Sequence, residues 1–328
     1  MKTRLLGPSH LEVSAVGLGC MSMNFGYGRP SPEKDMIELI HEAVDLGVTL
    51  FDTAESYGPF TNEELVGRAL EGLRDRVSIA TKCGISFAAD GNLILDARPG
   101  TIRRSLEGSL RRLRTDHVDI YYLHRFDPKV PIEEVAGAMA EFIAEGKIRG
   151  WGLSEVGPET VARAQSVCPL TAVENEYSIV IRESEHRLFD VLEKFGIGFV
   201  PYSPLARGFL TGTIKEGLKL VETDFRRNLP LFEDKNIAAH RKLLDFIGEL
   251  AADRNATPAQ IALAWVLAQR PWIVPIPGTT KPHRLRENIG AVEIEFTADE
   301  MAEFNRRLDE LPITCPRYND RFVEMTAP

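Results

Sequence analysis

The sequence predicts an α/β fold: a (β/α)8 TIM barrel with an N-terminal β-hairpin and extra C-terminal helices. Three observations indicate this fold. Short apolar runs alternate with helical patterns, polar side chains stand where several of these runs end, and no Gly/Ser-rich or charged linker divides the 328 residues. We therefore expect one domain over residues 1–328.

A hairpin is expected first, over residues 3–13, because Leu6 is followed by the turn-forming sequence Gly-Pro-Ser. It is suited to plug the N-terminal mouth of the barrel. The barrel strands are expected at the apolar runs, with amphipathic or alanine-rich helices between them. These runs cover residues 16–20, 48–52, 77–82, 118–124, 149–153, 171–175, 198–202 and 272–276. The connection from Tyr202 to about Ile237 is unusually long, which in a compact fold usually indicates a functional loop.

Composition excludes several classes of function. A net charge of -9 without a basic stripe argues against nucleic acid as a partner. The N-terminus lacks the apolar core of a signal peptide, and no apolar run approaches the roughly 20 residues of a membrane span, so we expect a cytoplasmic protein away from membranes. The cysteines have no CxxC spacing and the histidines no HxH or HExxH pairing, so reduced thiols and no metal site are expected.

Two short motifs are misleading. Residues 17–22 begin like a dinucleotide-binding fingerprint, but they lack its third glycine and no helix pattern opens until near Ser31. Residues 152–157 are one residue too long for the nucleophile elbow of a hydrolase. Neither motif therefore indicates the function of the protein.

Four residues at or just past predicted strand ends form a plausible catalytic group: Asp52, Tyr57, Lys82 and His124. Neighbouring strand ends lie roughly 4.8 Å apart, so these side chains can converge on one pocket. The Lys82 ammonium is expected to lower the pKa of Tyr57, Asp52 to hold Lys82 charged, and His124 to act as a second donor. A general acid beside a donor suits a carbonyl oxygen that gains negative charge. Because none of the four is a convincing nucleophile, a bound hydride donor is the simplest source of electrons.

Each of these residues also has a structural interpretation. Asp52 is suited to cap a helix, Tyr57 to fill a loop, and His124 to a buried structural role. Lys82 is harder to explain structurally, because a lysine that ends so apolar a strand is rarely placed near a barrel axis without a partner.

The order of these and other motifs resembles the aldo-keto reductase superfamily along essentially the whole chain. The matching stretches are residues 17–21, 51–58, 80–82, 119–125, 150–154, 176–178, 201–205 and 276–281, with Glu287 and Asn288. The resemblance implies an NADPH-dependent oxidoreductase that reduces small aldehydes or ketones, with Tyr57 as general acid. The sequence around His124 and Gly278 is most similar to that of the short-loop branch of perakine-type and pyridoxal-type reductases.

The resemblance also implies a site for NADPH/NADP+. Tyr202 would stack on the nicotinamide, Ser154 and Glu174 would hold its carboxamide, and the loop after Tyr202 would meet the pyrophosphate. Glu174 stands where Gln is usual, and Glu155 where many relatives carry Asn; a carboxylate cannot donate to the carboxamide oxygen. The implied cofactor-binding residues are Gly19, Met21, Asp52, Ser154, Glu174, Tyr202, Ser203, Pro204, Leu205, Arg207, Gly208, Leu210, Gly278, Thr280, Lys281, Arg284, Glu287 and Asn288.

The preference for NADPH over NADH rests on the segment after the last strand. Pro282 suits the first turn of a helix, whose N-terminus attracts anions. Lys281 and Arg284 add cations suited to a 2′-phosphate, although both are also typical of solvated helix surfaces.

The substrate is less well specified. The candidates to wall the pocket are Met23, Asn24, Phe25, Tyr27, Phe87, Arg125, Phe126 and residues 225–232, with Arg317, Tyr318 and Phe322 of the tail able to reach the pocket or a neighbouring subunit. Part of residues 211–236 is expected to be mobile and to close over the cofactor.

The protein is expected to be a monomer or homo-oligomer. Two other functions stay open: a redox-coupled regulatory subunit similar to potassium-channel β subunits, and a cofactor-free isomerase or hydrolase using Asp52 and His124.

Overall fold

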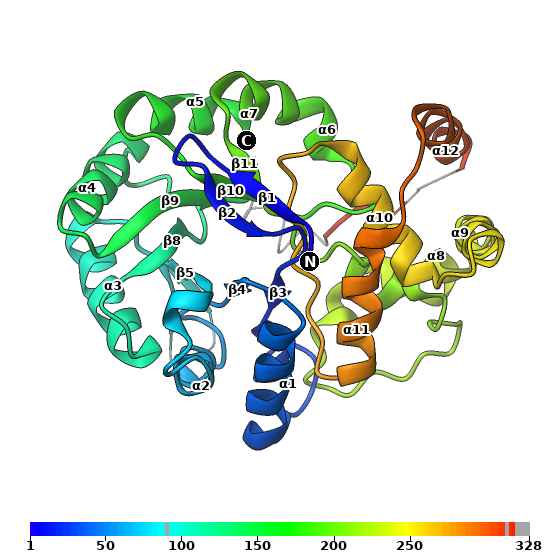
Figure 1. The fold of residues 1–328 in the computed structure, drawn as a ribbon, viewed down its shortest axis with the longest axis horizontal. Helices are drawn as coiled ribbons and strands as arrows, with labels where there is room; N and C mark the ends of the chain where they lie inside the picture. The colour runs from blue at the N-terminus through cyan, green and yellow to red at the C-terminus, as the bar shows by residue number, and fades with distance from the viewer. Residues whose placement is uncertain (89–91, 312–314, 319–328) are drawn as a thin grey trace.

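The computed structural model describes residues 1–88, 92–311 and 315–318, and Figure 1 shows helices arranged around a curled sheet. Seven parallel strands follow the order β11-β10-β9-β8-β5-β4-β3. Their bounds are Leu18–Gly19 (β3), Leu50–Asp52 (β4), Ser78–Cys83 (β5), Val118–Leu123 (β8), Ile148–Ser154 (β9), Ala172–Glu174 (β10) and Gly198–Phe199 (β11). Each strand lies within two residues of a predicted apolar run, or inside it.

The eighth strand position closes the sheet into a barrel. Residues 273–278 bridge to β11 on one side and to β3 on the other, through the parallel pairs Phe199–Ile273 and Gly19–Gly278. A Cβ atom on Gly19 would lie 2.8 Å from the Ile276 carbonyl oxygen, so only glycine permits this approach. The predicted (β/α)8 fold is confirmed.

Helices cover the outer face of the sheet, and further helices follow the barrel (Figure 1). Their bounds are Glu33–Asp45 (α1), Thr61–Ala69 (α2), Pro99–Leu113 (α3), Ile132–Ala144 (α4), Pro158–Val167 (α5), Glu183–Arg187 (α6), Phe189–Phe195 (α7), Asp234–Ala239 (α8), Arg241–Asp253 (α9), Pro258–Gln269 (α10), Pro282–Gly290 (α11) and Ala298–Glu310 (α12). Reciprocal capping boxes begin α10, which precedes the eighth strand position, at Thr257 and Gln260, and the added helix α12, at Thr297 and Glu300.

The N-terminal hairpin lies across one end of the barrel, as predicted, and Figure 1 shows it facing the viewer. It pairs β1 (Thr3–Leu6) with β2 (Leu11–Ser14) in antiparallel register. Leu6 and Val13 are buried in one cluster with apolar side chains of the barrel strands. The Arg4 guanidinium donates to the Ile273 carbonyl oxygen at 2.6 Å, which ties the hairpin to the eighth strand position. A second hairpin, of β6 (Ile85–Phe87) and β7 (Leu93–Leu95), is not predicted from the sequence.

The alternation of side chains along each strand positions the candidate site. Leu50, Ala80, Tyr122, Ala172 and Val200 belong to the buried cluster that the hairpin plugs. A residue two positions further along a strand points to the same side, one layer nearer the carboxyl ends. Those positions hold Asp52, Lys82, His124, Glu174 and Tyr202. The barrel thus changes from apolar to ionisable side chains within one layer.

The long connection after β11 contains only short helices. These are η3 (Ala206–Thr211), η4 (Phe225–Asn228), η5 (Pro230–Phe232) and α8. The Phe225 amide donates to the Gly26 carbonyl oxygen at 2.9 Å, so this segment packs on the loop after β3.

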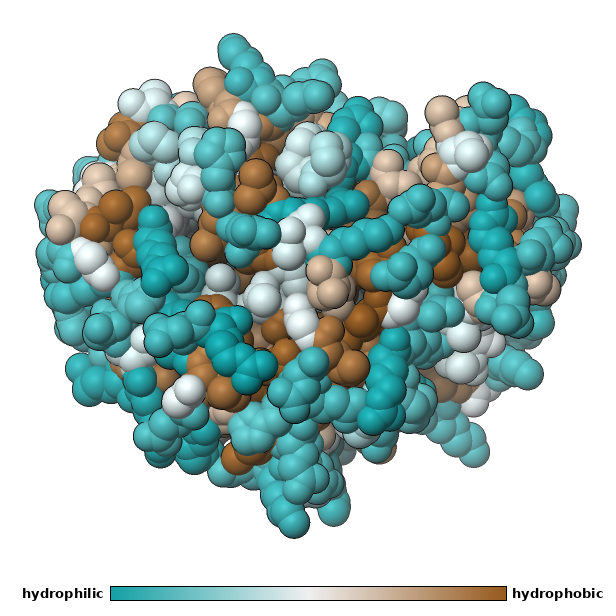
Figure 2. Space-filling model, in the orientation of Figure 1, coloured by the Kyte–Doolittle hydropathy of each residue, from teal (hydrophilic) through white to brown (hydrophobic). Residues whose placement is uncertain are grey.

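Polar side chains cover most of the face seen in Figure 2, with apolar side chains showing between them. Within the described part of the chain, no helix has the length and apolar character needed to cross a bilayer.

Candidate active site

Lys82 lies at the centre of the candidate site, on β5, with its side chain fully buried. Its ammonium Nζ lies 2.5 Å from Asp52 Oδ1 and 2.9 Å from the Thr53 carbonyl oxygen. Burial alone would lower the pKa of Lys82, but Asp52 and Glu174 outweigh it and hold this pKa above its usual value. Lys82 is therefore charged at neutral pH.

Glu174 approaches the same ammonium from β10. Its Oε1 lies 3.3 Å from Lys82 Nζ, and the Glu174 side chain is 3% exposed. Burial and then the neighbouring Asp52 raise the pKa of Glu174 to about 8, against the opposing effect of Lys82. The sequence predicted Glu174 near the cofactor carboxamide, but its contact with Lys82 was not foreseen.

Tyr57 lies beside Lys82, whose Nζ is 5.2 Å from the centre of the phenol ring. The predicted effect of this neighbour is only partly right. Lys82 does favour the phenolate, but burial has the larger effect, and the pKa of Tyr57 is raised above its usual value. The phenol consequently keeps its proton at neutral pH, which is the form that a general acid requires.

His124 completes the predicted group of four. Its ring packs edge-on against Tyr57, with ring centroids 5.7 Å apart, and its Nδ1 lies 3.3 Å from the Ser56 hydroxyl oxygen. Burial, followed by the charges of Arg125 and Lys82, lowers the pKa of His124 well below its usual value. The imidazole is therefore neutral. Ser56 was not identified from the sequence, where only its place in the loop after β4 could have indicated it.

Aromatic side chains extend from Tyr57 toward the surface. The Phe25 ring is stacked with that of Tyr57 at 6.5 Å between centroids and 14° between planes. Phe87 lies 6.5 Å from Phe25, and both phenylalanines are partly exposed. These contacts agree with the prediction that the loops after the first and third barrel strands wall a pocket.

A buried network of charges flanks this group at the ends of β9, β10 and β11. Glu176 pairs with Arg207 and accepts from Arg317 Nε at 2.8 Å. Burial alone would raise the pKa of Glu176, but Arg207 and Arg317 together lower it to about 2. The Arg317 guanidinium also donates to Glu155 Oε1 at 2.6 Å. The sequence indicated Glu176 only as part of the matching stretch 176–178. Its position two residues after Glu174 is the signal that could have identified it.

The C-terminal tail reaches this network, as predicted. The Arg317 guanidinium donates to the Tyr202 hydroxyl oxygen at 2.9 Å, and the Tyr318 hydroxyl lies 3.2 Å from that of Tyr202. Phe322 lies outside the described residues. Ser154 is held in the same region, because its hydroxyl accepts from Arg125 Nη1 at 3.1 Å.

The loop predicted to meet the pyrophosphate has an unusual backbone. Ser203, Ala206 and Arg207 all have positive φ angles, at 51°, 48° and 55°, and Gly208 follows at 92°. Residues other than glycine adopt such angles rarely, and clusters of them occur at ligand-binding loops. Of these four residues, Ala206, Arg207 and Gly208 are consecutive, and the amides of Ala206 and Gly208 donate to the Ser203 and Leu205 carbonyl oxygens of the same loop. The same loop contains Pro204, Leu205 and the buried Leu210.

The predicted phosphate-reading residues lie on α11, apart from the group around Lys82. Lys281 is the N-cap residue of α11, Pro282 occupies its first turn, and no side chain caps its amides. Lys281 and Arg284 are exposed, whereas Asn288 is buried. Thr280, Glu287 and Met21 are partly buried on the segments near the Gly19–Gly278 bridge.

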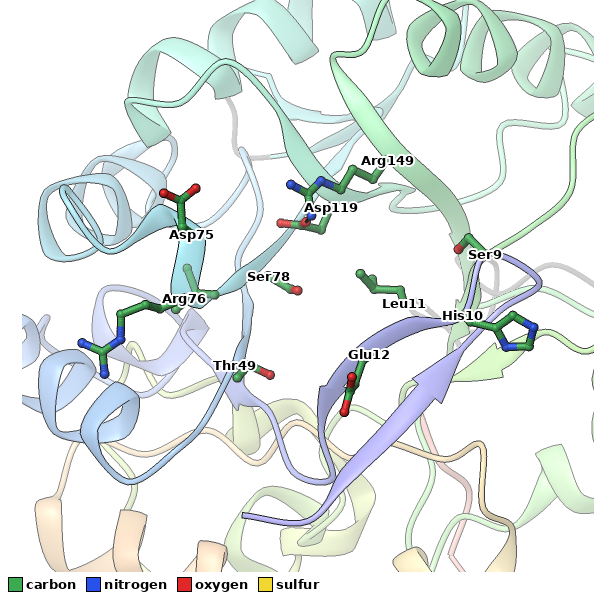
Figure 3. Close-up of a pocket in the computed structure, with 11 residues that line it drawn as sticks. Ser9, His10, Leu11, Glu12, Thr49, Asp75, Arg76, Ser78, Asp119 and Arg149 are labelled. Carbon is green, nitrogen blue, oxygen red and sulfur yellow. Dashed lines mark ion pairs between the residues drawn. The ribbon is translucent and has the colours of Figure 1, made fainter.

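A cavity of about 450 Å³ lies at the opposite, hairpin end of the barrel. Figure 3 shows Glu12 of the hairpin on one side and Asp119 with Arg149 on the other. Asp119 Oδ2 accepts from Arg74 Nη2 at 2.6 Å and from the Ile79 amide at 2.8 Å, while Arg149 approaches Oδ1 at 3.2 Å. These interactions join strand ends, so the cavity belongs to the structural base of the barrel.

Comparisons with known proteins agree with this architecture. A family model described as "Aldo/keto reductase family" matches residues 15–309. A glycerol dehydrogenase from Gluconobacter oxydans is 29% identical with a TM-score of 0.87, covering 96% of this chain and 97% of that one. A thermostable aldo-keto reductase, Tm1743, solved with the inhibitor epalrestat, is 32% identical with a TM-score of 0.76, covering 95% and 100%.

An aldo-keto reductase from Klebsiella pneumoniae, solved in complex with NADPH, is 27% identical with a TM-score of 0.73, covering 97% of this chain and 99% of that one. These structures do not test the similarity to perakine-type and pyridoxal-type reductases, which stays a prediction.

Proposed function

Because the chain belongs to the aldo/keto reductase family, we propose that it reduces small aldehydes or ketones to alcohols with NADPH as hydride donor. We further propose that residues 1–328 act as one domain, since a single buried cluster includes residues from Leu18 to Leu308. The proposed reaction class is that of NADP-dependent alcohol dehydrogenases, acting on CH–OH donors in the reverse direction.

The observation that carries this proposal is the buried contact of a protonated phenol with a charged lysine. Lys82 is held by Asp52 at 2.5 Å and lies under the ring of Tyr57, while His124 packs against the edge of that ring. A group of this kind supplies a proton and stabilises the oxygen that gains charge.

The residues then have separate tasks. Tyr57 donates its proton to the carbonyl oxygen of the substrate, and Lys82 stabilises the phenolate that remains. Neutral His124, with Nδ1 accepting from Ser56, would carry its proton on Nε2 and offer a second donor to the same oxygen. Asp52 keeps Lys82 charged and oriented. When bound, the dihydronicotinamide supplies the hydride that reduces the carbonyl carbon.

The described residues fit NADPH at three places. The positive-φ loop at 203–208 would lie against a pyrophosphate, and the uncapped start of α11 with Lys281 and Arg284 suits a 2′-phosphate. At the nicotinamide end, Glu174 Oε2 is buried and has no hydrogen-bond partner among the described residues. Ser154 and Tyr202 lie on the neighbouring strand ends.

A panel of aldehydes and ketones, with loss of the absorbance of reduced cofactor as the signal, tests the proposal. We expect turnover of small carbonyl compounds, aromatic ones included, because Phe25 and Phe87 line the approach to Tyr57. Binding of NADPH without turnover of any carbonyl compound would instead favour the regulatory alternative.

A further inference from the structure

Two buried carboxyl groups face one ammonium in the candidate site. Lys82 Nζ lies 2.5 Å from Asp52 Oδ1 and 3.3 Å from Glu174 Oε1, and the three side chains are 0%, 4% and 3% exposed. The residues come from β5, β4 and β10, so the barrel closure itself brings the second carboxyl group to a lysine that already has a partner.

Among the described residues, Lys82 is the only cation that forms an ion pair with either carboxyl group. The other titratable groups that face Glu174 are Tyr57, Tyr122 and Arg125, and the phenols are neutral because burial raises the pKa of both. Arg125 favours ionised Glu174, but it also lies close enough to Glu155 for their charges to interact. Two carboxylates that share a dry site cannot both ionise cheaply, so one of them keeps a proton.

The unpaired oxygens of the two carboxyl groups agree with such a proton. Asp52 Oδ2 and Glu174 Oε2 are both buried, and neither has a hydrogen-bond partner among the described residues. Because both carboxyl groups contact the same ammonium, they lie next to one another. One proton held between them would relieve the repulsion between two carboxylates and provide a donor for these oxygens.

We propose that Asp52 and Glu174 hold one proton in common beside Lys82 in the cofactor-free protein, and that Glu174 keeps this proton when the cofactor binds and turns it toward the carboxamide oxygen, so that it is a positioning residue which orients the nicotinamide in its neutral form. The second part rests on the proposed function. A neutral carboxyl group has one O–H donor and one carbonyl acceptor, the same pair that a glutamine amide offers. Neutral Glu174 can therefore both donate to and accept from a carboxamide, whereas ionised Glu174 can only accept.

Because Asp52 and Glu174 share the proton, the two carboxyl groups lose it in a single titration step. Burial and then Asp52 raise the pKa of Glu174 to about 8, which places this step just above neutral pH. Above it, the site loses its donor and gains a negative charge. Affinity for NADPH then falls by up to about tenfold for each further pH unit.

An infrared titration of the cofactor-free protein tests the shared proton directly. We expect the carbonyl stretch of a protonated carboxylic acid at neutral pH, and its loss as the pH rises past about 8. The part of the band that is lost past about pH 8 should be absent from E174Q and persist in E38Q, which removes an exposed carboxylate from α1. This comparison separates it from any band of the buried Glu55, whose pKa burial raises to about 7. Absence of the band from the wild-type protein at neutral pH would overturn the inference without any variant.

The dissociation constant of NADPH, measured by tryptophan fluorescence between about pH 6 and about pH 10, tests the positioning role. Wild type and E38Q should lose affinity for NADPH at alkaline pH, whereas E174Q, which keeps an amide donor at every pH, should not. The same alkaline loss of affinity in E174Q as in wild type would contradict the role of Glu174. Failure of every form to bind NADPH would refute the proposed function, while the infrared band would still decide whether the proton is shared.

Discussion

At the scale of single residues, cofactor preference depends on Lys281 and Arg284. Changing Lys281 or Arg284 to Met should weaken NADPH binding by about 1.5 to 3 kcal/mol where the contact is well formed, and leave NADH binding nearly unchanged. The reason is that only NADPH carries the 2′-phosphate. Isothermal titration with both cofactors measures this, with Lys242→Met on the exposed face of α9 as control. Equal losses for NADPH and NADH would show that the two residues do not read the phosphate.

The positions of single residues in the candidate site were easier to predict than their protonation. Asp52, Lys82 and His124 were identified because polar side chains follow apolar strands, and this placement holds. The raised pKa of Tyr57 was not predicted, because the burial that causes it depends on side chains from distant parts of the chain. The contact of Glu174 with Lys82 likewise depends on the order of strands in the sheet, which no local pattern contains.

At the scale of elements, the predicted strand bounds agree best with the observed ones where every residue has a backbone N–H to donate to the sheet. The run predicted at 118–124 forms β8 over Val118–Leu123. The run predicted at 198–202 forms a two-residue strand and one further bridge, at Tyr202, and the run predicted at 272–276 forms a single bridge, at Ile273. Pro201, Pro275 and Pro277 explain the difference, because proline has no N–H to donate. The apolar runs thus predicted the positions of the strands, but not how many residues of each run pair with a neighbouring strand.

The connection after β11 carries the prediction that belongs to this scale. Its only regular structure is short helices, and its Arg207 joins the buried charge network next to the positive-φ loop. We expect bound NADPH to raise hydrogen-exchange protection over residues 207–232, because the phosphates supply partners to the loop amides. Helix α4, far from this segment in the sequence, serves as internal reference. Unchanged protection over residues 207–232 would mean that the loop is a preformed wall and does not close.

At the scale of the whole molecule, the tail connects the end of the chain to the centre of the barrel. Arg317 contacts Glu155, Glu176 and Tyr202, which lie at the ends of three different strands. The sequence indicated that the tail can reach the pocket, but not which acids it would meet. Those partners lie on strands far from Arg317 in the sequence, so no local pattern could identify them.

Arg317→Ala should therefore destabilise the protein in a pH-dependent way. The variant leaves Glu155 buried without its guanidinium partner, and breaking a buried pair typically costs about 3 to 5 kcal/mol. Arg317 lowers the pKa of Glu155 below its ordinary 4.5, and Arg207 and then Arg317 lower that of Glu176 to about 2. The contribution of Arg317 is therefore present above pH 4.5 and lost as the pH falls toward about 2.

Urea unfolding at neutral pH and near pH 3 measures this difference. The loss should be larger at neutral pH, and Arg317→Lys, which keeps the charge, should lose less than Arg317→Ala. A loss of the same size at both pH values would show that Arg317 acts by packing alone.

The most direct test of the proposed reaction is the effect of Tyr57→Phe on NADPH-dependent reduction of the best carbonyl substrate. The variant removes one hydroxyl group and keeps the ring that packs against Phe25 and His124. Since the phenol acts where charge develops in the transition state, kcat should fall by about 10² to 10⁴, while the dissociation constant of NADPH stays nearly unchanged. A variant that keeps more than about a tenth of the wild-type kcat would contradict the assignment of Tyr57 as the general acid.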